Sequence, residues 1–475
     1  MELIQSGISH SKNTIPQHWH IGQLLHYDFA VFGRMSHQPL LQAAPSEFLL
    51  DLKPVTSSVW SSALKPLLIV FWFVSAFSQL LLMGSILVIP VLEYSLESNP
   101  IFSIGFPFFR FTFVLNFLLW LWGCLSVYLS HRRVHYLSIL TTTLERSLSP
   151  TNCFTLASFL SIGWNVLFLL FLFTITGFLP LPKPFLPLYP SAFLSPLSPY
   201  PFLVIVYFGL VFFFPFRSCY SRPRNYLLST LFHCLIAPFG RIGFNEFFWA
   251  DILTSLSKVF LDFYFTGCMF FNIHSPSILD ANDRCQVSLA FWTPFLLVFP
   301  FWVRFWHCVR NIIKFSPSCL CSFRFCSAHP HSTNALKYLM SIAAILFSIV
   351  SGRFNHENSV FYYLFLASNF ISSFYASLFD LFVDWGLLEN LEDRNVTLLR
   401  RKLYLSPCYY PLVIVINIFL RFFWLLFAFP MHLWFFAPLV LVVQESVEVF
   451  RRILWAILRI EWEQIKLEKQ YLVLQ

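Results

Sequence analysis

One arginine lies deep inside an apolar run near the end of the chain. Arg421 comes about a dozen residues into that run, and Trp424 follows it on nearly the same helical face. A guanidinium at such a depth in a bilayer costs roughly 3 kcal/mol or more unless a cavity, an anion or a carboxylate accommodates it. After one further apolar segment, Glu448 and Arg452 share a helical face, and Arg451 lies beside them. These residue types at this spacing predict an anion site within a membrane.

Phosphate matches these cations better than chloride does. It carries roughly one to two negative charges near neutral pH, and its several acceptor oxygens suit the fork of arginine and the point charge of lysine. Arg421, Arg451, Arg452 and Lys337 are the side chains that would form the cage. For Arg451 and Arg452, position alone slightly favours a different interpretation, in which they anchor the cytosolic end of a span. Arg421 has no such alternative.

The apolar segment 248–272 carries a polar stripe. Asp251, Ser255, Lys258 and Asp262 recur there at helical spacing. Two interpretations are equally good for this segment alone: internal pairing of Asp with Lys that only holds helices together, or a polar pathway. Charged groups at several depths along one face favour the pathway.

A second polar stripe comprises Asn369, Ser373, Ser377, Asp380 and Asp384. Any one hydroxyl more commonly bonds back to the backbone of its own helix. The two carboxylates are harder to explain in that way. We expect Asp380 and Asp384 to hold the arginines in place when no anion is bound, and to release them when an anion arrives.

The composition places all of these residues in a polytopic membrane protein. Of the 475 residues, 57% are hydrophobic and only 11% are charged, and the mean hydropathy is +0.67. Soluble domains carry roughly 25% charged residues. The net charge of +8 is dispersed among loops rather than gathered into a stripe, which excludes a nucleic-acid-binding surface. The predicted fold class is all-α, with about ten transmembrane helices.

The candidate spans are apolar stretches of about 20 residues. They lie near residues 66–93, 104–129, 154–180, 201–216, 248–272, 287–304, 337–352, 359–380, 409–429 and 431–449. Basic loops alternate with weakly charged ones, so the positive-inside rule puts both termini in the cytosol and requires an even number of spans. The polar stretch 1–62 shows no cleavable signal peptide and is interpreted as a cytosolic tail. The sequon at Asn395 then faces the cytosol and should stay unglycosylated.

Most of the cysteines predict nothing beyond packing. There are 11, an odd number, and four of them lie in or near apolar runs where a thiol simply packs: Cys124, Cys234, Cys268 and Cys308. The loop from Cys319 to His331 holds three thiols and two imidazoles that could bind zinc. Its spacing matches no ordinary zinc knuckle, so a plain or palmitoylated loop is favoured and no metal is expected.

A membrane enzyme is a competing class of function. Membrane glycosyltransferases and phosphatases present a paired acidic metal site, or a nucleophile with its base. Asp280 and Asp283 resemble a paired acidic metal site only weakly. No cluster of carboxylates accompanies the histidines His307, His329 and His331. We therefore expect neither enzymatic activity nor a cofactor.

Several blocks of the chain resemble the EXS domain, and they appear in order from about residue 230 to 465. They include Phe248 to Leu256, Phe299 to Arg310, Asn334 to Tyr338, Asp384 to Leu387, Leu420 to Trp424 and Glu448 to Glu463. The resemblance implies an EXS-type helix bundle over 226–475. N-terminal transmembrane helices over 63–225 would precede it.

The EXS family includes phosphate exporters that carry an SPX domain and the ER-retention-defective proteins of the fungal Golgi. The chain is interpreted as lacking room for an SPX domain, so it resembles the second group. That resemblance implies a Golgi membrane protein that moves phosphate from the lumen to the cytosol and supports retention of Golgi glycosyltransferases. The plasma membrane and the endoplasmic reticulum are alternative locations. The protein could form a homodimer. The alternative function is a non-transporting adaptor that sorts or retains Golgi enzymes.

The resemblance also implies residue roles. The phosphate-binding residues would be Asp251, Thr254, Lys337, Tyr338, Arg421, Arg451 and Arg452. Trp424 and Glu448 would lie near a gate, with Asp380 and Asp384 in support. Thr254 stands where the exporters have asparagine, and its hydroxyl keeps one donor but has less reach.

Overall fold

The computed structural model describes residues 65–88, 100–140, 149–176, 199–213, 221–236, 243–272, 277–315, 330–354, 360–387, 399–400, 402–428 and 437–474. In these segments all regular structure is helical, which confirms the predicted all-α class. The predicted N-terminal tail, the sequon at Asn395 and the loop from Cys319 to His329 lie outside the described residues.

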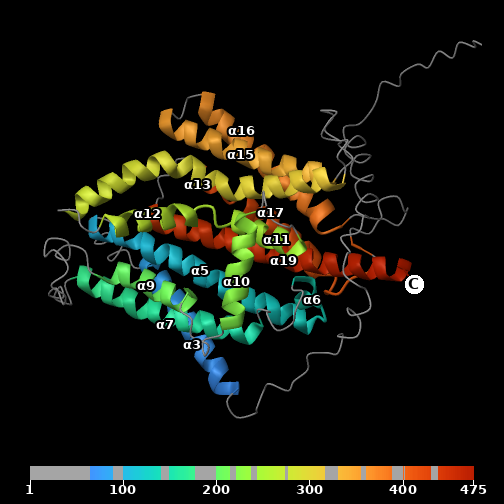
Figure 1. The fold of residues 1–475 in the computed structure, drawn as a ribbon, viewed down its shortest axis with the longest axis horizontal. Helices are drawn as coiled ribbons and strands as arrows, with labels where there is room; N and C mark the ends of the chain where they lie inside the picture. Colours follow the sequence, from blue (N-terminus) through green and yellow to red (C-terminus); the bar gives the residue numbers. More distant parts are fainter. Residues whose placement is uncertain are drawn as a thin grey trace, which may run out of the picture.

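The first half of the chain forms a helix group around α7. Its helices are α3 (Lys65–Val88), α5 (Pro100–His131), α6 (Tyr136–Leu140), α7 (Pro150–Ile175), α9 (Tyr200–Phe213) and α10 (Ser221–Leu235). The long helix α7 packs against α3, α5 and α9 (Figure 1). It begins after Ser149, whose hydroxyl accepts a hydrogen bond from the amide of Asn152, and Pro150 occupies its first position.

Aromatic side chains hold α5 and α7 together. The Phe109 ring lies 4.9 Å from that of Phe168 and 5.1 Å from that of Phe171, measured between centroids. Trp164 packs edge-on against the same ring and donates a hydrogen bond to the Phe109 carbonyl at 3.0 Å. Stacked, tilted and edge-on ring contacts of this kind add about 0.5–1.5 kcal/mol each beyond area burial.

The second half of the chain forms the larger group. Its helices are α11 (Phe244–Thr254), α12 (Val259–Phe271), α13 (Ile278–Phe315), α15 (Pro330–Phe354), α16 (Val360–Phe379), the π-helix η2 (Asp380–Asp384), α17 (Tyr409–Arg421), α18 (Leu425–Ala428) and α19 (Ala437–Leu474). Helix α15 packs between α13 and α16 along the outer edge of the bundle (Figure 1). The long helix α19 runs through the middle and packs against both α5 and α17.

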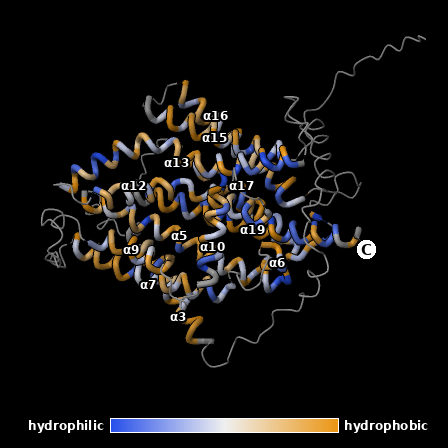
Figure 2. The backbone as a smooth tube through the Cα atoms, in the orientation of Figure 1, coloured by the Kyte–Doolittle hydropathy of each residue, from blue (hydrophilic) through white to orange (hydrophobic). Residues whose placement is uncertain are grey.

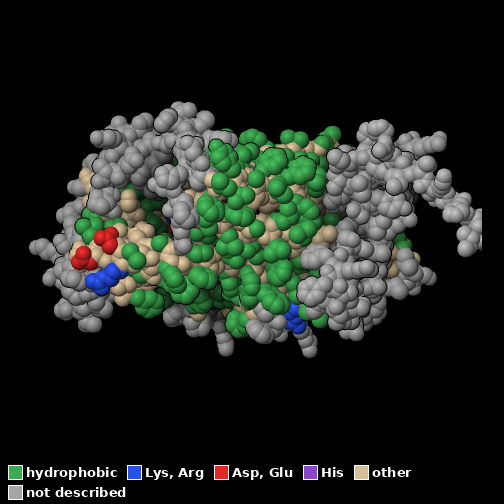
Figure 3. All heavy atoms as spheres, turned by 90° about the horizontal axis from the view of Figure 1, so that it is seen from above, with side chains coloured by type: hydrophobic (Ala, Val, Ile, Leu, Met, Phe, Trp, Pro, Cys, Tyr) green, Lys and Arg blue, Asp and Glu red, His purple; other side chains and the backbone are tan. Residues whose placement is uncertain are grey.

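The described helices fit a membrane. Six are long and apolar enough to cross one, namely α3, α5, α7, α13, α15 and α16 with η2, and α9, α12 and α17 are shorter apolar helices. Large apolar side chains such as Leu67, Phe73 and Phe213 are more than half exposed. Apolar side chains cover the middle of the face in Figure 3, and the few charged side chains visible there lie at its left end and at its lower edge. Lipid is the solvent that suits such a surface.

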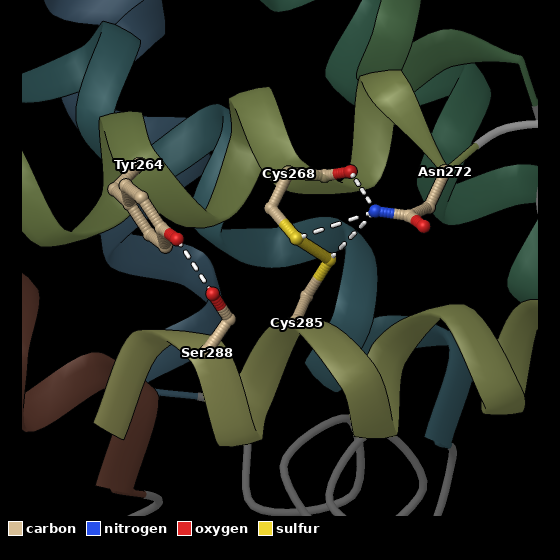
Figure 4. Close-up of a disulfide and its surroundings, with 5 residues drawn as sticks. All are labelled: Tyr264, Cys268, Asn272, Cys285 and Ser288. Atoms are coloured by element: carbon tan, nitrogen blue, oxygen red, sulfur yellow. Dashed lines mark hydrogen bonds between the residues drawn. A yellow bond between two sulfur atoms is a disulfide. The ribbon is translucent and has the colours of Figure 1, made fainter. Parts of the chain in front are cut away.

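A disulfide corrects one expectation from the sequence. Cys268 of α12 is bonded to Cys285 of α13, with the Cα atoms 5.8 Å apart, so the prediction that Cys268 simply packs is wrong (Figure 4). Helices α12 and α13 pack side by side, which brings together two cysteines 17 residues apart. The hydroxyls of Tyr264 and Ser288 also meet across the two helices, at 2.6 Å.

The two ends of the bundle differ, and we name each by its residues. The disulfide end holds Cys268 and Cys285. The basic end holds α6 and the last turns of α19, where the amide of His135 donates to Gln464 and Arg400 pairs with Glu461 at 2.7 Å. Figure 1 shows α6 and the C-terminus at this same end.

Candidate functional site

Two helices are interrupted at the centre of the bundle and a third changes to a π-helix there, and the candidate site lies at these irregular positions. Residues 255–258 separate α11 from α12, the π-helix η2 continues α16, and residues 422–424 separate α17 from α18. Discontinuous helices near the midplane are typical of transporter binding sites, and π-helical turns are frequent at functional sites. Figure 2 shows hydrophilic stretches along α19 in the middle of the bundle, whereas α7 and α9 are mainly hydrophobic.

The first part of the site joins two arginines through one carboxylate. The guanidinium of Arg421, at the end of α17, donates a hydrogen bond to Asp380 of η2. Arg451 of α19 lies 3.9 Å from the same carboxylate oxygen and donates to the Asn417 amide oxygen at 3.2 Å. Two further bonds of 2.8 and 2.5 Å link Arg451 to Glu448. The structure thus brings together two predicted cage arginines, one predicted support and one predicted gate residue.

Arg452 has a different set of partners. Its guanidinium donates to the hydroxyls of Ser255 and Thr254, each at 3.0 Å, and lies 4.9 Å from the Trp455 ring centroid. Among the described residues it makes no ion pair, although Ser255 itself donates to Glu448 at 2.9 Å. A guanidinium whose direct hydrogen-bond acceptors are both neutral hydroxyls is a natural position for a bound anion.

Lys337 and Asp384 extend the site towards the basic end. The Lys337 ammonium lies 3.3 Å from the Asp384 carboxylate, which also accepts a hydrogen bond from Trp455 at 3.2 Å. Arg459, one helical turn further along α19, lies 3.7 Å from Asp384. At the end of η2, Gly386 has a φ of 58°, and a Cβ there would come within 2.3 Å of the Trp462 ring. Glycine is therefore required for the turn that follows Asp384.

Asp251 and Tyr338 lie together, but a third residue binds both of them. Arg304 of α13 donates to the two Asp251 oxygens at 3.0 and 2.9 Å, and the Tyr338 hydroxyl donates to the same carboxylate. The Arg304 side chain is fully buried, with its guanidinium 3.6 Å from the Phe247 ring centroid. The Asp251 charge is therefore compensated by Arg304, and both of its carboxylate oxygens already accept hydrogen bonds at the edge of the site. The predicted role of Asp251 as a direct phosphate ligand stays a prediction.

The predicted gate residues line a cavity. Trp424 donates to the Ser373 hydroxyl at 3.1 Å, and its ring lies 6.2 Å from that of Phe365. Together with Arg421 and Glu448 it borders a cavity of about 130 Å³ that lies between the arginines and the disulfide end.

The charged residues of the polar stripe in 248–272 do not pair with one another. Lys258 donates a hydrogen bond to Gln444, and Asp262 accepts one from Arg110.

The charges of this centre do not balance. Arg421, Arg451, Arg452 and Lys337 face Asp380, Asp384 and Glu448, while Arg304 and Asp251 neutralise each other. In their ordinary ionised states these groups leave one positive charge in excess. A buried excess charge is unfavourable unless a counter-ion accompanies it, so the centre is suited to a small anion.

Sequence reasoning missed several of these residues. Arg304 and Arg110 are arginines in or beside predicted spans, the same signal that singled out Arg421. Asn417 carried no signal of its own, because one amide in an apolar run commonly has a structural role. Helical spacing places Trp455 on the face of Glu448 and Arg452, but it did not indicate the contact of Trp455 with Asp384. Ser255 was recognised only as part of the polar stripe, and its position between Arg452 and Glu448 follows from the fold.

Fold and site together define a polytopic all-α membrane protein with a buried charged centre. The chain matches the EXS family over residues 105–465. It is 30% identical over 374 residues to SPX and EXS domain-containing protein 1 of Dictyostelium discoideum, covering 77% of this chain and 37% of that protein. Identity to solute carrier family 53 member 1 of Homo sapiens is 27% over 377 residues, covering 76% of this chain and 49% of that protein.

A relative in Danio rerio, named xenotropic and polytropic retrovirus receptor 1 homolog, is 27% identical over 373 residues, with 76% of this chain and 49% of that protein covered. The chain thus spans half or less of the length of these relatives. The chain belongs to the EXS family.

Proposed function

We propose that this protein moves inorganic phosphate across a membrane through the charged centre. The observation that carries the proposal is Arg452, a buried guanidinium held by two hydroxyls and by no carboxylate among the described residues, with Arg421 and Arg451 beside it. Three cations from two helices can surround an oxyanion and donate to several of its oxygens. The relatives that bear the name solute carrier support the class of function.

The arrangement suits passage as well as binding. Arg421, Arg451 and Lys337 each have a carboxylate partner. When an anion arrives, each of these cations replaces its carboxylate acceptor with an oxygen of the anion. Such exchange keeps binding weak enough for release, which conduction through a membrane requires. Hinge-like interruptions in α11–α12 and α17–α18 provide backbone that can move without unfolding a whole helix.

Location, direction and physiological role are finer parts of the proposal. We place the protein in the Golgi membrane, with phosphate moving from lumen to cytosol and with a role in retaining Golgi glycosyltransferases, on the sequence resemblance described above. A homodimer is not needed for the site, since every residue named in it comes from a single chain.

The test is phosphate flux in proteoliposomes made with the purified full chain. We expect saturable movement of radiolabelled phosphate that unlabelled phosphate competes with and chloride does not. Equal flux in protein-free liposomes would refute transport. In that case a non-transporting adaptor, which would depend on the cytosolic loops and the C-terminus, would account better for the family resemblance.

A further inference from the structure

Lys258 is a second cation without a carboxylate partner, and it lies on the disulfide side of the charged centre. It ends the interruption between α11 and α12 and is the N-cap residue of α12. Its ammonium donates a hydrogen bond to the Gln444 side-chain oxygen of α19. Among the described residues no carboxylate oxygen comes within 4.0 Å of it, so a neutral amide is the acceptor that holds this charge.

The cavity of about 130 Å³ connects Lys258 to Arg421. Lys258, Gln444 and Ser257 line it together with Arg421, Trp424 and Glu448. One water molecule needs about 10–15 Å³ of such volume, so the cavity has room for an oxyanion with part of its hydration shell. Arg421 belongs both to this cavity and to the charged centre, because it pairs with Asp380 on its other side.

We propose that Lys258 and Gln444 form a second phosphate-binding station, through which the anion passes between the disulfide end and the Arg421 cage. The proposal rests on the proposed phosphate transport and adds a site to it. The Lys258 ammonium provides a mobile point charge, and the Gln444 amide can turn to donate its own N–H groups once the lysine binds phosphate. Arg421 lines the same cavity and receives the anion next.

A buried acidic side chain, Glu445, also borders the cavity and interacts electrostatically with Lys258 and with Arg110 of α5. One of its oxygens has no hydrogen-bond partner among the described residues, so it can accept a hydrogen bond from the hydration water of an anion in the cavity.

The experiment compares variants by initial phosphate flux in proteoliposomes of defined orientation, with phosphate supplied at one face at a time. Lys258→Gln removes the charge and keeps a polar side chain. We expect it to raise the KM at the disulfide-end face roughly tenfold, because phosphate then loses one hydrogen bond to a charged group. The KM at the basic-end face should stay within about twofold of wild type, while Lys258→Arg should retain most of the affinity.

A second variant leaves Lys258 in place. Gln444→Glu gives the lysine a carboxylate partner that competes with phosphate, so it too should raise the KM at the disulfide-end face. The matched control is Lys402→Gln, an exposed lysine at the basic end, and it should change neither KM. Should Lys258→Gln fail to fold, Gln444→Glu decides the question.

The outcomes separate this station from the proposed function. A wild-type chain without phosphate flux refutes transport itself. If the wild type transports phosphate and both Lys258→Gln and Gln444→Glu keep the wild-type KM at the disulfide-end face, the second station is refuted and the charged centre alone carries the anion.

Discussion

Asp380 accepts a hydrogen bond from Arg421, and this contact joins η2 to α17 across the charged centre. The same carboxylate oxygen lies 3.9 Å from Arg451 and 3.4 Å from the Asn417 amide nitrogen. A carboxylate thus occupies the position that lies between two arginines. Because a phosphate oxygen would seek those same donors, we expect Asp380 and the transported anion to compete for them.

The first prediction concerns that competition. Asp380→Asn removes the charge that faces Arg421 and Arg451, and it leaves two buried guanidinium groups poorly compensated. Breaking such a pair from one side typically costs about 3–5 kcal/mol. We expect the variant to melt at a lower temperature than wild type without phosphate, and to gain more stability from added phosphate. Thermal unfolding in detergent over a phosphate series measures both effects.

Glu461→Gln is the control for this prediction. It removes the carboxylate partner of Arg400 in another buried pair, at the basic end, in which side-chain exposure is below a tenth on both sides. The pair lies outside the charged centre, so its loss should lower the melting temperature while the gain from phosphate stays at the wild-type value. The competition model is contradicted if the two variants respond to phosphate alike.

The second prediction concerns Arg304, which we regard as a positioning residue. Arg304→Gln leaves Asp251 with an uncompensated charge beside the anion path, and Asp251→Asn leaves Arg304 without a partner. Each single change should destabilise the fold by about 3–5 kcal/mol and lower phosphate flux. The double variant removes both charges and should recover stability beyond the additive value. A double-mutant cycle of unfolding free energies measures the coupling, and strictly additive values would contradict it.

The third prediction is topological. Cys268 and Cys285 form a disulfide at the end of the bundle opposite α6 and the last turns of α19. The alternation of basic loops predicts that the basic end faces the cytosol, and disulfides persist in oxidising compartments. In sealed membrane vesicles with the cytosolic face outward, an impermeant phosphine followed by a maleimide mass tag should therefore leave this pair unlabelled, whereas permeabilised vesicles should show labelling. Labelling in intact vesicles would reverse the assigned orientation.

The fold class followed from composition because lipid demands helices and few charges. Apolar stretches near 154–180, 337–352 and 359–380 correspond to α7, α15 and α16, whose backbone polar groups must bond within each helix. The interruptions within α11–α12 and α17–α18 were not predicted. They contain no proline, and they depend on contacts such as Ser255 with Glu448 that only the assembled bundle provides.

The site was partly predictable for a related reason. A charge in an apolar run needs a partner, so Arg421 and Asp380 were recognisable one by one, and the structure pairs them. The partner of Asp251 was not recognisable, since Arg304 comes 53 residues later and several other cations were equally plausible from sequence. The disulfide was missed for the same reason, because pairing depends on how α12 lies against α13.

The most direct test of the charged centre is phosphate flux through Arg421→Ala in proteoliposomes. Removing this guanidinium takes away about 3 kcal/mol of anion binding, so flux should fall roughly a hundredfold while the protein stays folded and correctly located. Arg421→Lys should recover only part of the flux, because lysine keeps the charge without the planar fork. Arg284→Ala, an exposed arginine on α13, should transport normally. Wild-type flux through Arg421→Ala would contradict a central anion site.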